Sequence, residues 1–228
     1  MAVALAGAGA NVVCASSQRG GCEATAAAIR ELGKNAWEVH ADLSDRTAAL
    51  AMADEAEGAA GQIDILVNNG GAIRRLPALE HSEEDWDAVL RVNLEATFFL
   101  SQRFGRAMVE RRAGKIINIA SLLSFRGGVH VPAYTASKHA VAGLTKALAN
   151  EWGQYGVQVN AIAPGFFVTD NTAPLRAGAG ASKIQERIPA GRWGNPEDLE
   201  GAVVFLASRA SDYVNGHLLV VDGGWMAG

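Results

Sequence analysis

The chain has 228 residues, of which 49% are apolar and 19% charged, enough for one well-buried core and unlike the composition of a disordered protein. Its net charge of −4 argues against a nucleic-acid surface, and its apolar runs are far shorter than the ~20 residues of a membrane-spanning helix. We therefore expect a single domain over residues 1–228, with neither a nucleic-acid nor a membrane partner. Cys14 and Cys22 lack metal-ligand or redox spacing, so we expect reduced cysteines in a cytoplasmic protein without a metal site.

Short apolar runs alternate with longer amphipathic segments, which is typical of a parallel sheet with helices on both faces. The expected strands are Asn11–Ala15, Ala36–His40, Ile63–Val67, Lys115–Ala120, Val157–Ala163 and His217–Val221. The expected helices are Gly20–Leu32, Asp45–Ala60, Glu83–Arg112, Ala133–Tyr155 and Pro196–Ser208. Ser82 before Asp85, and Asn195 before Pro196, predict two of the helix starts. The predicted fold class is α/β, a doubly wound parallel sheet in one domain.

Gly7 and Gly9 lie ahead of the first expected strand. A phosphate-binding glycine loop has to follow a strand and open a helix, so that helix N-terminal amides face the phosphates. Here the order is reversed, and Val12 stands where the fingerprint needs its third glycine. We expect Met1–Ala6 to be the end of a helix, and the two glycines to form a turn after it.

A group of three polar residues in the middle of the chain indicates proton-transfer chemistry. Ser121 ends an expected strand, and Tyr134 and Lys138 lie four residues apart at the start of a helix, on one face. A neighbouring ammonium lowers the pKa of a tyrosine from about 10 towards the useful range. Ser121 can hold a carbonyl oxygen against the Tyr134 hydroxyl, which suits protonation of an alkoxide as hydride arrives, or the reverse. Alone, a Tyr-x-x-x-Lys pair also occurs by chance on solvent-facing helices.

Several stretches resemble one enzyme family over essentially the whole chain. They are "DILVNNGG", "VNL", "IINIAS", "YTASKHAV", "VQVNAIAPGF", "RWGNPEDL" and "NGHLLVVDGG". Together they resemble the short-chain dehydrogenase/reductase family, which implies a Rossmann-like fold and an NAD(P)-dependent oxidoreductase acting on CH–OH groups. The resemblance implies that Tyr134 is the general acid/base, and that Lys138 tunes it and binds the nicotinamide ribose. It further implies that Ser121 orients the carbonyl and that Asn93 holds a water in a proton relay. The alternative for Asn93 is a polar residue that bends its helix.

The resemblance also implies a nicotinamide dinucleotide cofactor. Asp42 matches the acidic residue beside the adenine, and Gly70 stands where the family usually has alanine. The expected cofactor-binding residues are Ser16, Asp42, Leu43, Asn69, Gly70, Tyr134, Lys138, Pro164, Gly165 and Thr169. Ser16 and Ser17 occupy the place of the acid that accepts a ribose 2′-hydroxyl, and Arg19 follows them. NAD is expected only from the branch of the family described below, and NADP stays open.

Family members begin with a strand and a glycine-rich loop that lead into the first helix. The chain starts inside the helix that follows, so the resemblance predicts an N-terminally truncated form of the fold. The hypothesis is that the functional protein starts earlier than Met1. The alternative is a protein of another class, catalytically silent and free of cofactor, and NADH binding distinguishes the two.

The stretches "NNGGAIRR", "IASLLSFRGG", "VPAYTASK", "NTAPLR", "RIPAGRWG" and "SDYVNG" resemble the 2-dehydro-3-deoxy-D-gluconate 5-dehydrogenases of this family. This implies a deoxy sugar acid as substrate, a substrate loop at about 164–194 and a homotetramer. Arginine suits carboxylate recognition, and the expected substrate-binding residues are Arg74, Arg75, Arg126 and Arg192, with Arg176 in the same group of loops. The alternatives are a gluconate 5-dehydrogenase and a 3-oxoacyl carrier-protein reductase, which needs a basic patch that the sequence does not clearly provide.

Overall fold

The computed structural model describes residues 1–228 and contains six strands in two parallel sheets. The two-stranded sheet pairs β1 with β2, and the four-stranded sheet has the order β3-β4-β5-β6. The strands are β1 (Val12–Ser16), β2 (Ala36–His40), β3 (Ile65–Asn68), β4 (Gly114–Ile119), β5 (Val157–Pro164) and β6 (Leu218–Val221). Each expected strand is confirmed within two residues at either end.

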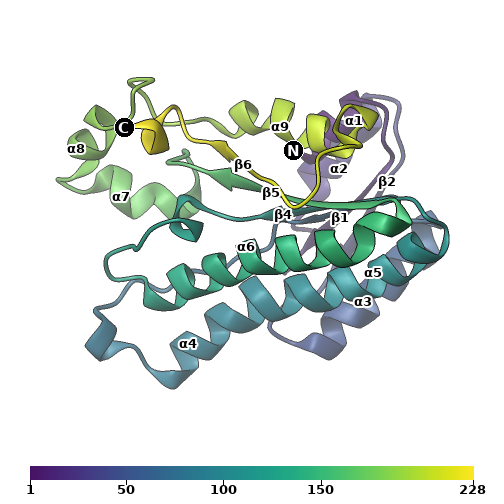
Figure 1. The fold of residues 1–228 in the computed structure, drawn as a ribbon, viewed down its shortest axis with the longest axis horizontal. Coiled ribbons are helices and arrows are strands. Elements are labelled where there is room, and N and C mark those ends of the chain that lie inside the picture. The colour runs from purple at the N-terminus through teal and green to yellow at the C-terminus, as the bar shows by residue number, and fades with distance from the viewer.

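The structure has nine α-helices, of which α7 and α8 lie at one end of the molecule near the C-terminus (Figure 1). They are α1 (Ala2–Gly7), α2 (Glu23–Glu31), α3 (Arg46–Ala60), α4 (Glu83–Leu90), α5 (Ala96–Glu110), α6 (Pro132–Trp152), α7 (Ala173–Ala177), α8 (Ala181–Glu186) and α9 (Glu200–Ala207). One face is covered by α3, α5 and α6, and the other by α1, α2 and α9 (Figure 1). This is the doubly wound arrangement that the alternating pattern predicts.

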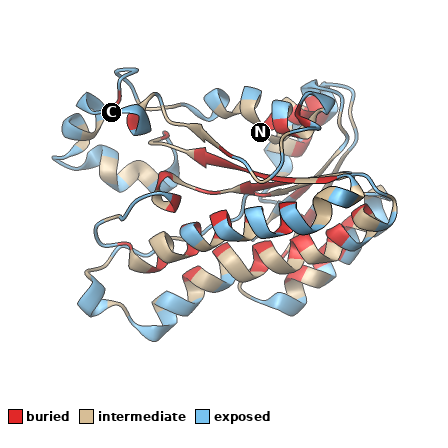
Figure 2. Ribbon diagram, in the orientation of Figure 1, coloured by how far each residue is buried: buried red, intermediate tan, exposed pale blue.

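The centre of the four-stranded sheet is the most completely buried part of the molecule (Figure 2). On β4, Ile116 contacts the core beneath α5 and α6, whereas Ile117 contacts the core beneath α9. Successive side chains of a strand point to opposite faces, so a strand covered on both sides has to be apolar at consecutive positions. The run "KIINIA" meets that requirement. On β5, Val159 contacts the core beneath α5 and α6, and Ile162 contacts the core beneath α9.

The two sheets share one core although β1 and β3 are not hydrogen-bonded to each other. Val39 of β2 packs in the same group as Ile116 of β4, together with Met52 of α3 and Phe104 of α5. Burial of this shared apolar surface fixes the small sheet against the large one, since the hydrophobic contribution depends on area and not on strand pairing.

The N-terminal glycines form the expected turn. Helix α1 ends at Gly7, and Gly9 has a φ of 114°, a backbone conformation that favours glycine. The chain then enters β1, so this stretch is not a phosphate-binding loop.

Two segments differ from the sequence expectation. The helix expected over Glu83–Arg112 is interrupted by a π-helical turn, Arg91–Glu95, between α4 and α5. The stretch 164–194, expected to be irregular, contains the short helices α7 and α8. None of the helices combines the length and the apolar character that crossing a membrane requires.

Candidate active site

The three polar residues of the sequence pattern meet where β4 ends and α6 begins. Ser121 is the second residue after the end of β4, and Tyr134 and Lys138 lie in the first two turns of α6. Pro132 opens this helix, with its fixed φ in the first turn where no intrahelical amide bond is lost. The carboxyl ends of parallel strands are where α/β folds place their binding clefts.

Lys138 is a buried cation whose direct hydrogen bond goes to the backbone. Its side chain is only 4% exposed, and Nζ donates a hydrogen bond to the Ile119 carbonyl oxygen at 2.6 Å. The ammonium also lies 5.6 Å from the centroid of the Tyr134 ring. Because burial penalises the charged form, the pKa of Lys138 falls from 10.5 to about 8. Perturbed groups of this kind are concentrated at functional sites.

Tyr134 has a raised pKa, which corrects the expectation that Lys138 lowers it. Burial of the hydroxyl raises the pKa, and this effect outweighs the hydrogen bond with Ser121 and the positive charge of Arg75, which both lower it. The phenol is therefore neutral at neutral pH and can donate a proton. The sequence argument went wrong because it counted the neighbouring cation and not the loss of water around the hydroxyl.

Ser121 is held by a short capped turn, Leu122–Ser124. Its Oγ accepts a hydrogen bond from the Leu123 N–H at 3.1 Å, and its own N–H donates to Ser124 Oγ at 3.3 Å. Ser124 Oγ in turn donates to the Lys138 carbonyl oxygen at 2.7 Å. The serine is thus tied to the same helix that carries Tyr134 and Lys138.

Asn93 lies in the π-helical turn and is 1% exposed. Its side chain accepts a hydrogen bond from the Ala72 N–H at 2.7 Å and donates to the Ala72 carbonyl at 2.9 Å and to Ser137 Oγ at 3.0 Å. Ser137 Oγ then donates to the Tyr134 carbonyl oxygen at 2.7 Å. Asn93 therefore connects the loop after β3 with the first turn of α6. Asn93 thus both lies in the π-helical turn and connects this turn to α6. Its role in a water relay stays a prediction.

Sequence reasoning did not assign Asn118, Ser101 or Thr145, which form a second layer of polar residues with Asn68. Asn118 of β4 is fully buried, accepts a hydrogen bond from Asn68 Nδ2 at 2.9 Å and donates to Thr145 Oγ1 of α6 at 2.9 Å. Asn68 also donates to Ser101 of α5 at 3.0 Å. This network joins β3, β4, α5 and α6 directly behind the site. The available signal was an asparagine inside each of two otherwise apolar strands, "ILVN" and "IINI".

Residues expected to hold a nicotinamide dinucleotide line the same edge of the sheets. An alanine Cβ at Gly70 would overlap Leu43 Cδ1, which places the loop after β2 directly against the loop after β3. Asp42 is exposed, and its carboxylate accepts hydrogen bonds from Ser44 N–H at 2.9 Å and Ser44 Oγ at 2.8 Å, which lower its pKa. An exposed, ionised acid next to an open turn can accept an amino group and ribose hydroxyls, so these residues fit the adenosine end.

The remaining expected cofactor residues lie at the ends of β1 and β5. Ser16 Oγ donates to the Gln18 carbonyl at 2.5 Å in the turn after β1. Gly165 approaches Asp222 so closely that a Cβ would lie 2.7 Å from its Cα, and its N–H donates to the Val221 carbonyl at 2.9 Å. Thr169 begins the capped turn Asp170–Thr172. Ser16 and Pro164 are the last residues of β1 and β5, at the carboxyl ends of these strands, and the contact of this group with a cofactor stays a prediction.

The expected substrate arginines have different surroundings. Arg74 pairs with Asp85 at 3.3 Å, and Arg192 forms two hydrogen bonds with the Asp198 carboxylate at 2.7 and 2.8 Å, which lower the pKa of Asp198 to about 2. Arg75 donates to the Asn171 carbonyl at 3.0 Å, and its charge acts on the Tyr134 hydroxyl. Arg126 lies 5.8 Å from the Trp225 ring centroid. Of these four arginines, Arg75 is the one whose charge affects the pKa of Tyr134.

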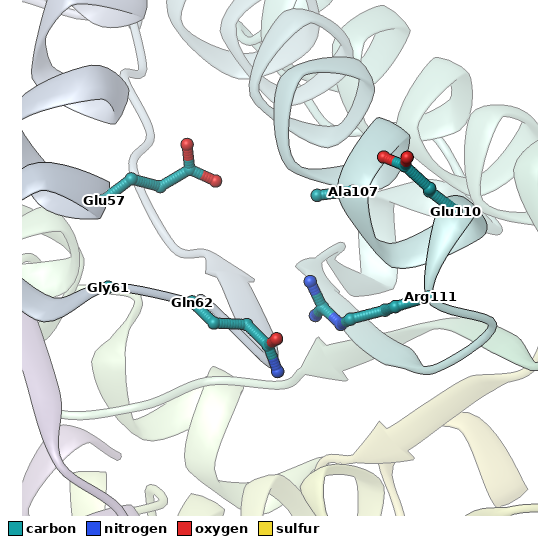
Figure 3. A pocket seen from close by; sticks show the side chains of 6 residues that line it. All are labelled: Glu57, Gly61, Gln62, Ala107, Glu110 and Arg111. Atoms are coloured by element: carbon teal, nitrogen blue, oxygen red, sulfur yellow. The ribbon is translucent and has the colours of Figure 1, made fainter.

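A separate hollow of about 400 Å³ lies at the opposite edge, where β3 begins (Figure 3). Its lining residues are Glu57, Gly61, Gln62, Ala107, Glu110 and Arg111. Glu57 is paired with Arg103 at 2.6 Å, and Arg111 donates to the Ile63 carbonyl at 2.6 Å. Ala107 is its one apolar residue, and a ligand pocket is usually lined mostly by apolar groups. This hollow is therefore a surface groove between α3 and α5, and the chemistry lies at the other edge.

Comparison with known proteins decides the family. The family profile described as "Enoyl-(Acyl carrier protein) reductase" matches residues 1–226. The chain belongs to the short-chain dehydrogenase/reductase family. It is 54% identical over 228 residues to a 2-dehydro-3-deoxy-D-gluconate 5-dehydrogenase of Bacillus subtilis, covering 100% of this chain and 89% of that protein. It is 50% identical to the protein of the same name from Dickeya dadantii, covering 100% of this chain and 90% of that protein.

A solved structure supports the fold. The crystal structure of a gluconate 5-dehydrogenase from Burkholderia cenocepacia, in complex with NADP and tartrate, is 41% identical and superposes with a TM-score of 0.94. The match covers 100% of this chain and 89% of that one. The Rossmann-like fold and the NAD(P)-dependent oxidoreductase class expected from the sequence are confirmed.

Proposed function

We propose that this protein transfers hydride between a nicotinamide dinucleotide and a hydroxyl or ketone group of a deoxy sugar acid, with 2-dehydro-3-deoxy-D-gluconate as the first candidate. The observation that carries the proposal is the buried ammonium of Lys138 beside Tyr134, with Ser121, which lowers the pKa of Tyr134, just beyond the end of β4. The names of the two bacterial relatives supply the substrate class.

The proposed proton chemistry follows from the protonation states. In the direction of reduction, the neutral Tyr134 phenol donates its proton to the alkoxide oxygen that forms as hydride reaches the carbonyl carbon. Ser121 donates a hydrogen bond to the same oxygen, and the Lys138 ammonium stabilises the phenolate left on Tyr134. In oxidation the proton moves from the substrate hydroxyl to the phenolate. The nicotinamide, when bound, supplies or accepts the hydride.

Asn93 and Ser124 act through these groups as positioning residues, because their hydrogen bonds end on the loop after β3 and on α6. Asn93 is also the proposed holder of a relay water. Ser16, Asp42, Leu43, Asn69 and Gly70 are proposed to bind the adenosine end. Pro164, Gly165, Thr169, Tyr134 and Lys138 are proposed to bind the nicotinamide end.

The proposed substrate cleft is bordered by the 164–194 segment and by the loop that carries Arg74 and Arg75. Arg75 already acts electrostatically on Tyr134, which supports a place near the reacting oxygen. Arg74 and Arg192 would have to exchange an acid partner for the substrate carboxylate. They are therefore weaker candidates than Arg75.

We also propose a cytoplasmic homotetramer. Tyr213 and Leu79 are fully exposed large side chains, and Phe98 and Phe99 form an edge-to-face pair at 5.1 Å on the outer layer. Exposed large side chains of this kind can mark interfaces between subunits, and the family resemblance supplies the tetramer. Light scattering after size-exclusion chromatography tests this, and a monomer with the mass of one 23.8 kDa chain would contradict it.

The experiment for the activity is a spectrophotometric assay of nicotinamide reduction with 2-dehydro-3-deoxy-D-gluconate. It is run with NAD and with NADP, against D-gluconate and against a neutral polyol as controls. The proposal requires turnover of at least one sugar acid well above that of the polyol. Binding of NADH without turnover of any sugar acid would contradict the substrate class, and no binding of either cofactor would favour the silent alternative.

A second candidate, gluconate 5-dehydrogenase, is favoured by the 41% identical structure of that name with NADP and tartrate. The same assay distinguishes it, because D-gluconate then has the higher kcat/KM. NADP in that structure and Ser16 at the end of β1 also support testing both cofactors.

A further inference from the structure

Two guanidinium groups lie beside one indole ring close to the candidate active site. The Arg187 Cζ lies 4.3 Å from the Trp225 ring centroid, and the Arg126 Cζ lies 5.8 Å from it. Trp225 belongs to the C-terminal turn, and Arg187 directly follows α8. Figure 1 shows both segments at the same end of the molecule. The two guanidinium carbons are therefore no more than about 10 Å apart, so both cations act on the same small region beside the indole ring.

Neither arginine is neutralised by the protein. Arg126 and Arg187 form no ion pair with an acid of the chain, and both residues are exposed. The acid within this turn, Asp222, already accepts the N–H groups of Gly224 and Met226 at 2.8 Å each. Arg74 and Arg192, by contrast, already have acid partners. Arg126 and Arg187 are thus cations without an acid partner. Arg75 and Arg176 also lack an acid partner but donate to backbone carbonyls, whereas no hydrogen bond holds the guanidiniums of Arg126 and Arg187.

Trp225 connects this charge to the catalytic serine. Its side chain is 7% exposed and packs with Leu122, which follows Ser121, and with Ile188, which follows Arg187. Phe166 lies against the same ring at 4.6 Å. The indole Nε1 is buried and has no hydrogen-bond partner in the protein. A buried donor of this kind is rare and costs stability unless an acceptor reaches it.

We propose that Arg126 and Arg187, arranged around Trp225, form the subsite for the carboxylate of the sugar-acid substrate, with the indole N–H as an additional donor. This inference rests on the proposed function and specifies the part of the site that selects an acid over a neutral sugar. Arg187 was absent from the residues expected from the sequence. Two guanidiniums give a carboxylate charge-assisted hydrogen bonds with a fixed geometry, which orients the remainder of the substrate towards Tyr134 and Ser121.

The test compares the binding of two ligands that differ only at the acid group. D-Gluconate and D-glucitol are titrated by calorimetry into the wild-type chain and the variants Arg126→Gln, Arg187→Gln and Arg187→Lys. Arg209→Gln is the matched control, because Arg209 is exposed, has no ion pair and lies after α9. Circular dichroism checks that each variant is folded. Since Arg126 and Arg187 are exposed and make no protein ion pair, folding is expected to persist.

We expect the wild type to bind D-gluconate at least about tenfold more tightly than D-glucitol. Each glutamine variant raises the Kd of D-gluconate by roughly tenfold, the loss of one charge-assisted bond, and leaves that of D-glucitol unchanged. Arg187→Lys has an intermediate effect, and Arg209→Gln has none. No preference for the acid, or a D-gluconate Kd that neither glutamine variant changes, overturns the subsite.

The outcomes also separate the subsite from the proposed function. If D-gluconate affinity depends on both arginines but no sugar acid is oxidised, the proposed function fails and the carboxylate subsite stands. If a sugar acid is oxidised while its KM and the D-gluconate Kd are insensitive to both arginines, the function stands and the subsite is wrong.

Discussion

Replacement of Lys138 by methionine removes a buried charge, and the effect on stability is calculable. Lys138 is 4% exposed, and burial lowers its pKa from 10.5 to about 8. The ammonium is therefore less stable in the folded chain than in the unfolded chain. A shift of this size corresponds to about 3 kcal/mol, and methionine keeps most of the side-chain volume while removing the charge.

The sign of the pH dependence follows from proton counting. Between pH 8 and 10.5 the unfolded chain binds more protons at Lys138 than the folded chain, so its contribution to stability rises with pH. The penalty is fully present below pH 8 and is lost as the pH rises through 10.5. Titration of Lys138 therefore makes the wild type less stable than Lys138→Met by about 3 kcal/mol at pH 7, and by about 1 kcal/mol at pH 10.

Urea unfolding of both proteins between pH 7 and pH 10 measures this difference, because other titrating groups cancel between them. The variant also loses the hydrogen bond to the Ile119 carbonyl. While the ammonium is charged, this loss changes the difference in unfolding free energy by a constant amount, so the direction of its pH dependence is the same. Lys138→Met is at the same time expected to lose most of the hydride-transfer activity. A difference in unfolding free energy that does not vary with pH would refute a titrating, buried Lys138.

Three further predictions concern positions around the site. Asn93→Ala removes the hydrogen bonds to both backbone groups of Ala72 and to Ser137, so the unfolding free energy measured in urea should fall by about 3 kcal/mol. A loss near zero would contradict the positioning role. The methyl group of Gly70→Ala overlaps Leu43, so the variant should lose about 1 kcal/mol of unfolding free energy, and Leu43→Ala should partly restore it in a double-mutant cycle. Additive losses would contradict direct contact. Ser16→Asp should raise the KM for NADPH on the order of tenfold relative to the KM for NADH, because a carboxylate repels a ribose 2′-phosphate. An unchanged ratio of the two KM values would show that the ribose binds elsewhere.

The layers of the fold follow from local sequence patterns. The runs of β4 and β5 are apolar at consecutive positions, which only a strand covered on both faces requires. Ser82 caps α4 by accepting the Asp85 N–H at 3.0 Å, as its spacing predicts. A helix irregularity at Asn93 was expected only as an alternative, because the hydrogen-bond partner Ala72 lies 21 residues earlier in the chain.

The residues of the candidate site could be predicted from the sequence, but the shifts of their pKa values could not. Ser121, Tyr134 and Lys138 could be placed together from a strand end and a helix start. The direction of the Tyr134 pKa shift could not, since it depends on how much water the rest of the fold removes. The same limit applies to the arginines. Whether Arg192 faces a substrate or Asp198 depends on the path of the 164–194 segment, which its glycine- and alanine-rich sequence leaves open.

The central claim, that Tyr134 exchanges a proton with the substrate, is tested most directly by Tyr134→Phe. This substitution removes one oxygen atom and keeps the ring beside Lys138. NADH and NADPH affinity is measured by cofactor fluorescence, and kcat with 2-dehydro-3-deoxy-D-gluconate by absorbance. The account predicts cofactor affinity within about twofold of wild type, and a kcat lower by about 10²–10⁴-fold. A variant that binds cofactor and retains a kcat close to wild type would contradict it.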